Sequence, residues 1–331
     1  MKNKINLGII GKNFGLQVVY KAFLKNKNFK VLGFSYKSKI FDKLKIPKNV
    51  KVYTDWKKLI LDKKIQAVAV ATPPVTHKKI VNFAIKNNKH IFCEKPFTCS
   101  VQETKNICKL IKKKNISHMV NYEFAEIEAF RFFKNNVLNK KIKIKKISLN
   151  WFIGLRKRSN NTWKEKHEKG GGMIFNYVCH SIFYLEFLFG EILSVKSNIT
   201  LEKKSSLDVV LFFQSGLHAK IKVKLISNNS KINPIHQLKV VSNNGIYYLR
   251  SDVNRLSDQF KVIKGSKCLF KNKKSSTDFR IIPTFNNSKK FSSWILKGKK
   301  QKENFFMGQR IHVIINKMLL SSKKKEKVNI Y

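Results

Sequence analysis

The chain has 331 residues, of which 43% are apolar, and this length suits two hydrophobic cores better than one. A formal charge of +50 comes from 62 Lys and 7 Arg against 19 acidic residues, with the lysines spread along the whole chain. Nucleic-acid readers use Arg forks as well as Lys, so we interpret this charge as a solvated lysine surface and expect no specific nucleic-acid site.

The five cysteines form no C-x-x-C pair, and their number is odd. This pattern favours reduced thiols over a disulfide framework or a zinc site. The N-terminal residues lack the pattern of a secretory signal, and no apolar run approaches the length that crosses a bilayer. We therefore expect a cytoplasmic protein with no membrane segment and no metal.

The first 122 residues alternate short apolar segments with amphipathic ones. The predicted strands are 4–10, 29–35, 50–53, 66–71, 90–93 and 118–122. The predicted helices are 15–26, 55–62, 76–87 and 100–114. Strands that alternate with helices predict an α/β domain over 1–122, with a doubly wound parallel sheet and right-handed crossovers.

The pattern changes after residue 122. Residues 141–152 alternate Ile and Lys, which is typical of a half-buried strand. From 193 to about 263, extended segments follow one another with polar turns between them. We therefore predict a second domain over 123–331, of the α+β class, with an open, mostly antiparallel sheet. Its predicted helices are 123–138, 173–189, 289–296 and 306–321.

The turn between the first strand and the first helix reads Gly11-Lys12-Asn13-Phe14-Gly15. A dinucleotide pyrophosphate needs a tight turn, a close backbone approach and a helix N-terminus. We expect Gly11 to make the turn and Gly15 to let the helix pack closely on the strand. Asn13 occupies the place of the usual middle glycine; it tolerates positive φ, but its side chain narrows the approach to the phosphates. The turn predicts a Rossmann domain that binds NAD or NADP.

The end of the second strand reads Ser35-Tyr36-Lys37. NAD-binding folds usually place Asp or Glu here, to accept hydrogen bonds from the ribose 2′-hydroxyl. This chain has no acid at that point, and a hydroxyl followed by lysines suits a 2′-phosphate. We therefore expect NADP or NAD, with NADP slightly favoured. The alternative, that these lysines only reflect a lysine-rich composition, stays open.

Two loops follow later strands of the same predicted sheet. Thr72-Pro73-Pro74 comes after the strand at 66–71 and leads to His77, and Glu94-Lys95-Pro96 comes after the strand at 90–93. The carboxyl ends of parallel strands line the ligand crevice of a doubly wound sheet. All the residues of these two loops, with His77, are therefore predicted to bind the cofactor.

In the second domain, Gly170-Gly171-Gly172 leads into the predicted helix that carries Asn176 and His180. Positions four apart share one helix face, so both side chains are expected to point to the same side. Imidazole titrates near neutral pH and suits proton transfer. A single histidine is more often structural, but the glycine run before this helix favours a functional role.

The two loops and the glycine-led helix closely resemble the glucose-fructose oxidoreductase / inositol dehydrogenase / rhizopine-catabolism (Gfo/Idh/MocA) family. The resemblance implies that Lys95 is a catalytic or substrate-positioning residue beside the nicotinamide, and that the bond before Pro96 is cis. A strand-end ammonium can also stabilise a developing alkoxide on physical grounds. By the same resemblance, His180 is the general base or acid on the substrate hydroxyl, and Asn176 holds the substrate or orients the histidine. The family commonly has Asp at position 176 and often Asp at Tyr184, so His180 is expected to be a weaker base here.

The resemblance implies an NAD(P)-dependent oxidoreductase that moves a hydride between nicotinamide and a carbinol or carbonyl carbon of a sugar, sugar derivative or cyclitol. The substrate is expected to be a small hydroxylated molecule, and the positive charge favours an anionic one. A homo-oligomer is expected by analogy. One alternative is a catalytically weak protein that binds or senses dinucleotides, because of Asn13, Asn176 and the missing ribose acid. Only charge supports a nucleic-acid-binding protein.

Overall fold

The computed structural model describes residues 4–36, 46, 50–138, 142–154, 163–165, 169–201, 205–227, 230–252, 259–273 and 276–331. Lys37 lies outside the described residues, so its part in cofactor choice stays a prediction. The chain divides into two compact units. The first unit is Met1–Glu123, Lys166–Gly171 and Arg280–His312, and the second is Phe124–Glu165, Gly172–Phe279 and Val313–Tyr331.

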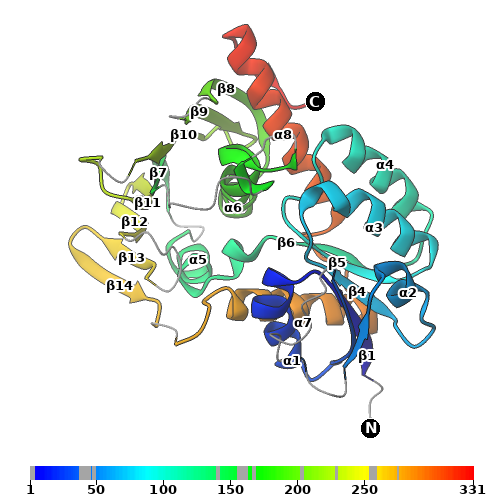
Figure 1. The fold of residues 1–331 in the computed structure, drawn as a ribbon. Helices are drawn as coiled ribbons and strands as arrows, with labels where there is room; N and C mark the ends of the chain where they lie inside the picture. The colour runs from blue at the N-terminus through cyan, green and yellow to red at the C-terminus, as the bar shows by residue number, and fades with distance from the viewer. Residues whose placement is uncertain are drawn as a thin grey trace. The chain divides into compact units, whose positions relative to one another are not determined.

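The first unit contains a six-stranded sheet in the order β3-β2-β1-β4-β5-β6, and every strand pairing in it is parallel (Figure 1). The strand order reverses between β1 and β4, so the predicted doubly wound α/β fold is confirmed. The strands are β1 (Ile5–Ile10), β2 (Phe29–Ser35), β3 (Lys51–Tyr53), β4 (Ala67–Val70), β5 (His90–Glu94) and β6 (His118–Asn121).

Helices follow β1, β3, β4 and β5, as the sequence pattern predicts. Strand β4 is buried at all four positions, because helices cover both faces of a parallel sheet. Side chains cap two of the helices: Asp55 accepts a hydrogen bond from the amide of Lys57, and Ser100 from that of Glu103. The helical segments of this unit are η1 (Gly15–Tyr20), α1 (Lys21–Leu24), α2 (Trp56–Leu61), α3 (Pro74–Lys86), α4 (Val101–Lys112) and α7 (Ile281–Lys297).

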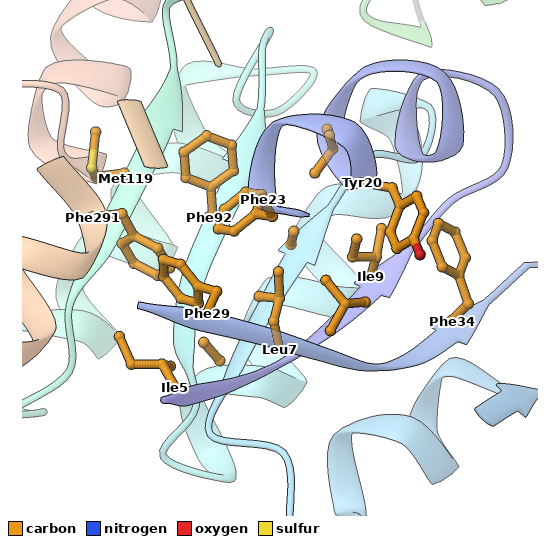
Figure 2. Close-up of a cluster of buried hydrophobic side chains, with 14 of the residues drawn as sticks. Ile5, Leu7, Ile9, Tyr20, Phe23, Phe29, Phe34, Phe92, Met119 and Phe291 are labelled. Carbon is orange, nitrogen blue, oxygen red and sulfur yellow. The ribbon is translucent and has the colours of Figure 1, made fainter. Parts of the chain in front are cut away.

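A core rich in phenylalanine lies between the sheet and the helical segments η1, α1 and α7 (Figure 2). The ring of Phe23 lies 4.8 Å from that of Phe29 and 5.2 Å from that of Phe92, in edge-on contacts. Phe291 of α7 stacks on Phe29 with 5.9 Å between the ring centroids. Helix α7 therefore packs in the core of the first unit, although it comes late in the chain. It also begins at Ile281, earlier than the helix predicted for 289–296.

The second unit contains a nine-stranded sheet in the order β14-β13-β12-β11-β7-β10-β9-β8-β15. The pairing of β10 with β7 is parallel and the other pairings are antiparallel, so the predicted open, mostly antiparallel sheet is confirmed. Strand β7 alternates buried and partly exposed residues, as expected for one covered face. The strands are β7 (Ile144–Gly154), β8 (Ile192–Thr200), β9 (Ser206–Phe213), β10 (His218–Ile226), β11 (Ile235–Ser242), β12 (Gly245–Ser251), β13 (Lys261–Lys264), β14 (Lys267–Lys271) and β15 (Val328–Asn329).

Two of the helical segments that remain are more irregular than the pattern predicts, whereas the last helix, Phe305–Lys324, extends the one predicted for 306–321. The helix predicted for 123–138 consists of a 3-10, an α and a π segment, and the one predicted for 173–189 begins with a π segment. Within the described ranges, no helix is both long enough and apolar enough to span a membrane. The segments are η2 (Glu123–Glu126), α5 (Glu128–Phe132), η3 (Phe133–Val137), η4 (Trp163–Glu165), η6 (Ile174–Val178), α6 (Cys179–Phe189) and α8 (Phe305–Lys324).

Candidate functional site

The turn after β1 contains a position that only glycine can occupy. Gly11 has a φ of +128°, and its amide donates a hydrogen bond of 2.9 Å to the carbonyl oxygen of Ser35 at the end of β2. A Cβ atom on Gly11 would lie 2.3 Å from the carbonyl oxygen of Ala71 after β4. The carboxyl ends of three neighbouring strands are therefore joined at this turn, with no room for a side chain.

Gly15 and Asn13 do not carry the roles expected of them. A Cβ atom on Gly15 would lie 3.6 Å from its nearest neighbours, which is ordinary van der Waals contact, so an alanine would fit. The close packing of the helix on the strand therefore does not require glycine at position 15, and the cofactor contact of Gly15 stays a prediction. Asn13 begins the helical run, and its φ is not positive. The structure therefore does not depend on the ability of Asn to adopt a positive φ at this position.

The residues that end β2 are buried. Ser35 is 2% exposed and Tyr36 is 6% exposed, and the ring of Tyr36 packs edge-on against Phe34. Their side chains belong to the core of the first unit. The sequence predicts that Ser35 and Tyr36 contact a ribose, but neither side chain is exposed to do so.

His77 of α3 joins the two loops that follow β4 and β5. It has no exposed surface; its Nε2 lies 2.8 Å from the carbonyl oxygen of Thr72, and its Nδ1 lies 3.2 Å from that of Phe97. Burial lowers the pKa of His77, so the ring is neutral and donates to one carbonyl at a time. The sequence predicted a direct cofactor contact, but this burial gives His77 the role of holding the loops. In the loop after β5, the Lys95–Pro96 bond is cis, as the family resemblance implies.

The Thr72-Pro73-Pro74 loop is held from two sides within the first unit. The Thr72 and Thr76 hydroxyl oxygens lie 2.7 Å apart, and Pro74 is the first residue of α3, where its fixed φ suits a helix start. Gly170 has a φ of +75°, and a Cβ atom on it would lie 2.8 Å from Pro74 Cβ. The first glycine of the glycine run is therefore needed for close packing on this loop, which the sequence did not reveal.

Lys95 is half-buried and directly follows β5, beside a buried carboxyl group. Glu94 Oε1 accepts a hydrogen bond of 2.7 Å from Asn121 Nδ2. Burial, and then the charge of Glu123, raise the pKa of Glu94 to about 8, against the opposing effects of Asn121, Lys95 and Arg280. Glu94 is thus largely protonated at neutral pH. Its side chain is only 6% exposed, so it stabilises the end of β5 from the interior. The sequence predicted a cofactor contact for Glu94, but little of its side chain is exposed to make one.

Helix α7 completes this buried polar network. Asn121 Nδ2 also lies 3.1 Å from Thr284 Oγ1, and Asn287 Nδ2 donates to Asn121 Oδ1 at 2.8 Å. At the start of the same helix, the guanidinium carbon of Arg280 lies 4.8 Å from the ring centroid of Phe14 in the glycine turn. None of these α7 residues could be predicted from the sequence, because no motif surrounds them.

His180, the second residue of α6, is held by an aromatic ring in the second unit. The ring centroids of His180 and Phe124 are 4.4 Å apart with an interplanar angle of 35°, and both residues are buried. Asn176 is half-buried in the preceding π segment η6. Single π turns inside helices often occur at functional sites. Asn176 and His180 thus lie on one continuous helical run, as predicted.

Tyr184, where the family often has Asp, pairs with a second buried histidine. The Tyr184 hydroxyl lies 3.0 Å from Nε2 of His236, and both residues have no exposed surface. Burial lowers the pKa of His236 to about 3 and raises that of Tyr184, so both side chains are neutral, and the tautomer of the ring decides which of the two donates. In the part of the chain that the structure describes, no group of three or more His, Cys, Asp or Glu could hold a metal ion.

The structure brings the predicted cofactor residues together within the first unit. The Gly11 turn, the Thr72 loop and Lys95 follow β1, β4 and β5, which are neighbours in the parallel sheet. Asn176 and His180 belong to the second unit. The residues that sequence reasoning missed in the first unit are Gly170, in a packing role, Asn121 and Glu123 beside Glu94, and Arg280 beside the glycine turn.

Two family models match the chain. One, described as "Oxidoreductase family, NAD-binding Rossmann fold", matches residues 5–122. The other, described as "GFO/IDH/MocA C-terminal domain", matches residues 143–247. Both belong to the same family, and together they cover more than half of the chain.

Curated proteins of several bacteria are similar to parts of this chain. An uncharacterized oxidoreductase of Synechocystis sp. is 27% identical over 202 residues, which are 59% of this chain and 54% of that protein. A 2,7-anhydro-N-acetylneuraminate hydratase of Escherichia coli is 29% identical over 138 residues, 40% of this chain and 36% of that protein. A levoglucosan dehydrogenase of Pseudarthrobacter phenanthrenivorans is 28% identical over 150 residues, 44% of this chain and 38% of that protein. The chain spans about half the length of the curated relatives that it matches over the longest segments.

Solved structures share the fold over nearly the whole chain. A levoglucosan dehydrogenase in complex with NADH and levoglucosan superposes with a TM-score of 0.82 at 18% identity, covering 99% of this chain and 100% of that one. An oxidoreductase from Thermotoga maritima gives a TM-score of 0.84 at 17% identity, covering 99% of both chains. These likenesses establish the fold.

Proposed function

Because the chain belongs to the Gfo/Idh/MocA family of NAD-binding oxidoreductases, we propose that it is an NAD(P)-dependent dehydrogenase or reductase that acts on a CH–OH group of a sugar, sugar derivative or cyclitol. The observation that carries this proposal is that the Gly11 turn, the Thr72 loop and Lys95 follow neighbouring strands at one edge of the sheet. The levoglucosan dehydrogenase among its relatives supports the substrate class.

The first unit fits a dinucleotide. The missing Cβ of Gly11 and the helix that starts at Asn13 form the arrangement that receives a pyrophosphate. The reversal of strand order between β1 and β4 is where doubly wound sheets bind their ligands. When bound, the dinucleotide supplies or accepts the hydride at its nicotinamide ring. We favour NADP slightly, because Ser35-Tyr36-Lys37 offers no carboxylate to a ribose 2′-hydroxyl.

Each catalytic candidate has a distinct task in this proposal. The Lys95 ammonium donates a hydrogen bond to the substrate oxygen and favours its alkoxide character. His180 takes the hydroxyl proton during oxidation and returns it during reduction. Asn176 holds the substrate or orients the imidazole, and the Phe124 ring restricts the plane of His180. Position 184, where the family often has Asp, is Tyr in this chain, and its hydroxyl is hydrogen-bonded to His236. His180 therefore works without a carboxylate at that position.

Two further properties belong to the proposal. The net charge of +50 favours an anionic substrate, such as a sugar acid, because it raises the local concentration of anions. The open face of the nine-stranded sheet is proposed to form a homo-oligomer. Size-exclusion chromatography with light scattering tests the second property, and a monomer at all salt concentrations would contradict it.

The decisive experiment is a fluorescence titration of the purified protein with NADPH and NADH. The variant Lys37→Ala tests the cofactor choice, and Lys30→Ala, an exposed lysine at the start of β2, is the matched control. Tight NADPH binding that only Lys37→Ala weakens supports NADP. A preference for NADH keeps the oxidoreductase and overturns the choice of NADP. Binding of neither dinucleotide overturns the proposed function.

Turnover is then measured with a panel of sugars, sugar acids and cyclitols. Nicotinamide absorbance reports net redox change, and NMR of the products reports reactions without one. A product at the oxidation level of its substrate would indicate chemistry like that of the hydratase relative. Dinucleotide binding with no product from any substrate would favour the sensing protein over the enzyme.

A further inference from the structure

Two helices of the first unit run side by side in the same direction. Arg280, just before α7, lies over Phe14, at the start of the helical run 13–24. Farther along α7, Ser288 Oγ accepts a hydrogen bond of 3.0 Å from Asn26 Nδ2, just beyond the end of that run. The order of these contacts places both helix N-termini at the same end of the pair, beside the glycine turn, and Figure 1 shows α7 next to α1.

A small apolar cluster fixes this arrangement. Ile281 of α7 and the neighbouring ring of Phe285 pack with Phe14, Val18 and Ala22 of the opposing helical run. The first turn of α7 therefore cannot slide along its partner without breaking these contacts. The position of Arg280 beside the turn is consequently determined by the core of the unit.

The charge of Arg280 is unfavourable for the helix that it precedes. Backbone amides give a helix N-terminus a partial positive charge, so a cation there lowers helix stability and an acid raises it. Arg280 is the N-cap residue of α7, and the first turn of α7 contains no acidic residue. The charge of Arg280 also opposes the rise in the pKa of Glu94 that burial causes, so the guanidinium lies near the strand end that precedes Lys95 as well as beside the glycine turn.

We propose that Arg280 binds the pyrophosphate of the dinucleotide and supplies, with its side chain, part of the binding that Asn13 removes from the glycine turn. This inference rests on the dinucleotide binding proposed above. The positive ends of two helices meet beside Arg280, and a guanidinium fork can bind two phosphate oxygens at once. Stacking on Phe14 holds the plane of that fork beside the turn.

The test compares Arg280→Gln and Arg280→Lys with the control Lys289→Gln. Lys289 is an exposed residue of the same helix that also lies over an aromatic ring, 4.6 Å from the centroid of Phe285. The control therefore removes an equal charge and a similar ring contact farther from the turn. The probes are NADH, ADP-ribose, which contains the diphosphate, and adenosine, which lacks it. Thermal melting checks that each variant folds.

We expect Arg280→Gln to weaken the binding of NADH and ADP-ribose about 10- to 100-fold, as for the loss of a charge-assisted bidentate contact. Adenosine affinity is expected to stay at the wild-type value, and Lys289→Gln to change none of the three. Arg280→Lys keeps the charge but loses the fork, so its loss is smaller but still measurable. If Arg280→Gln does not fold, the binding of NADH and ADP-ribose to Arg280→Lys is the test.

A double-mutant cycle tests the link to Asn13. Asn13→Gly restores the close backbone approach, so Arg280→Gln is expected to weaken ADP-ribose binding less in that background than in the wild type. Equal losses in the two backgrounds would overturn the compensation between the two residues.

Other outcomes are also decisive. Wild-type affinity of Arg280→Gln for ADP-ribose would overturn the inference while leaving the proposed function intact. A loss confined to NADPH, with NADH unchanged, would assign Arg280 to the 2′-phosphate and overturn the pyrophosphate contact. If the wild-type protein binds neither NADH nor ADP-ribose, the proposed function fails and the inference fails with it.

Discussion

The two units hold their candidate residues by different means. In the first unit, backbone groups make most of these contacts: the Gly11 amide donates to the Ser35 carbonyl, and the His77 ring donates to the carbonyl of either Thr72 or Phe97. In the second unit, an aromatic ring holds the catalytic candidate, because Phe124 packs against His180. Backbone constraints select glycine and proline and so leave a motif in the sequence. Ring packing accepts several residue types and leaves none.

The largest expected effect separates the tasks of the two units. His180→Asn is expected to lower kcat about 10²- to 10⁴-fold, the usual contribution of a general acid or base. The dissociation constants of NADH and NADPH are expected to stay unchanged, because the cofactor residues lie in the first unit. His218→Asn, at an exposed histidine of β10, is the control and should leave kcat unaltered. A His180→Asn variant with wild-type kcat would remove this residue from the mechanism.

The glycines of the first turn give the next effect. Gly11→Ala forces a side chain into a φ of +128° and against the Ala71 carbonyl, so it is expected to lower the free energy of unfolding by about 3 kcal/mol and to abolish NADH binding. Gly15→Ala has room for its methyl group and is expected to change stability by less than about 1 kcal/mol. Urea unfolding and NADH titration measure both variants. Equal losses would show that the helix approaches the strand more closely than these distances indicate.

The same contrast explains what the sequence could and could not predict. The strands of the first unit were predictable because covered parallel strands are continuous apolar runs. The first turns of α7 were not, because Thr284 and Asn287 are buried polar residues that interrupt the apolar pattern. Their partner in the hydrogen-bond network is Asn121, far away in the chain. Local periodicity contains no information on such a pairing.

Site residues follow the same division. Lys95 and the Gly11 turn could be found because their strands end in recognisable loops. Arg280 could not, since only the packing of α7 on the first helical run brings it to Phe14. In the second unit, the departure at Tyr184 was visible in the sequence, but its partner His236 was not, because strand pairing and helix packing bring the two together.

The buried carboxyl group of the first unit predicts a pH-dependent stability. The pKa of Glu94 is about 8 in the folded protein against an ordinary value of 4.5. Between these values the folded protein keeps a proton that the unfolded chain releases, so the free energy of unfolding falls as pH rises through this window. Glu94→Gln stays neutral and can still accept from Asn121, so it is expected to gain stability relative to wild type from pH 6 to pH 8, by at most about 1.4 kcal/mol per pH unit.

Urea unfolding at pH 6 and pH 8 measures this effect. Glu128→Gln, at an exposed carboxylate in the first turn of α5, is the control and is expected to follow the wild-type pH dependence. The difference between Glu94→Gln and wild type should be larger at the higher pH. A constant difference would mean that Glu94 is ionised in the folded protein throughout this range.

The smallest effect tests whether a hydrogen bond also stabilises the ring cluster of the second unit. Tyr184→Phe keeps the ring but leaves Nε2 of the fully buried His236 without its hydrogen-bond partner, so it is expected to lower the free energy of unfolding by about 1–2 kcal/mol. Tyr177→Phe is the control: this half-buried ring contacts Trp151 edge-on, and its loss of a hydroxyl is expected to have almost no effect. If both variants unfold at the same urea concentration, ring packing alone stabilises this cluster. The contrast with the hydrogen-bonded loops of the first unit would then be sharper than the structure indicates.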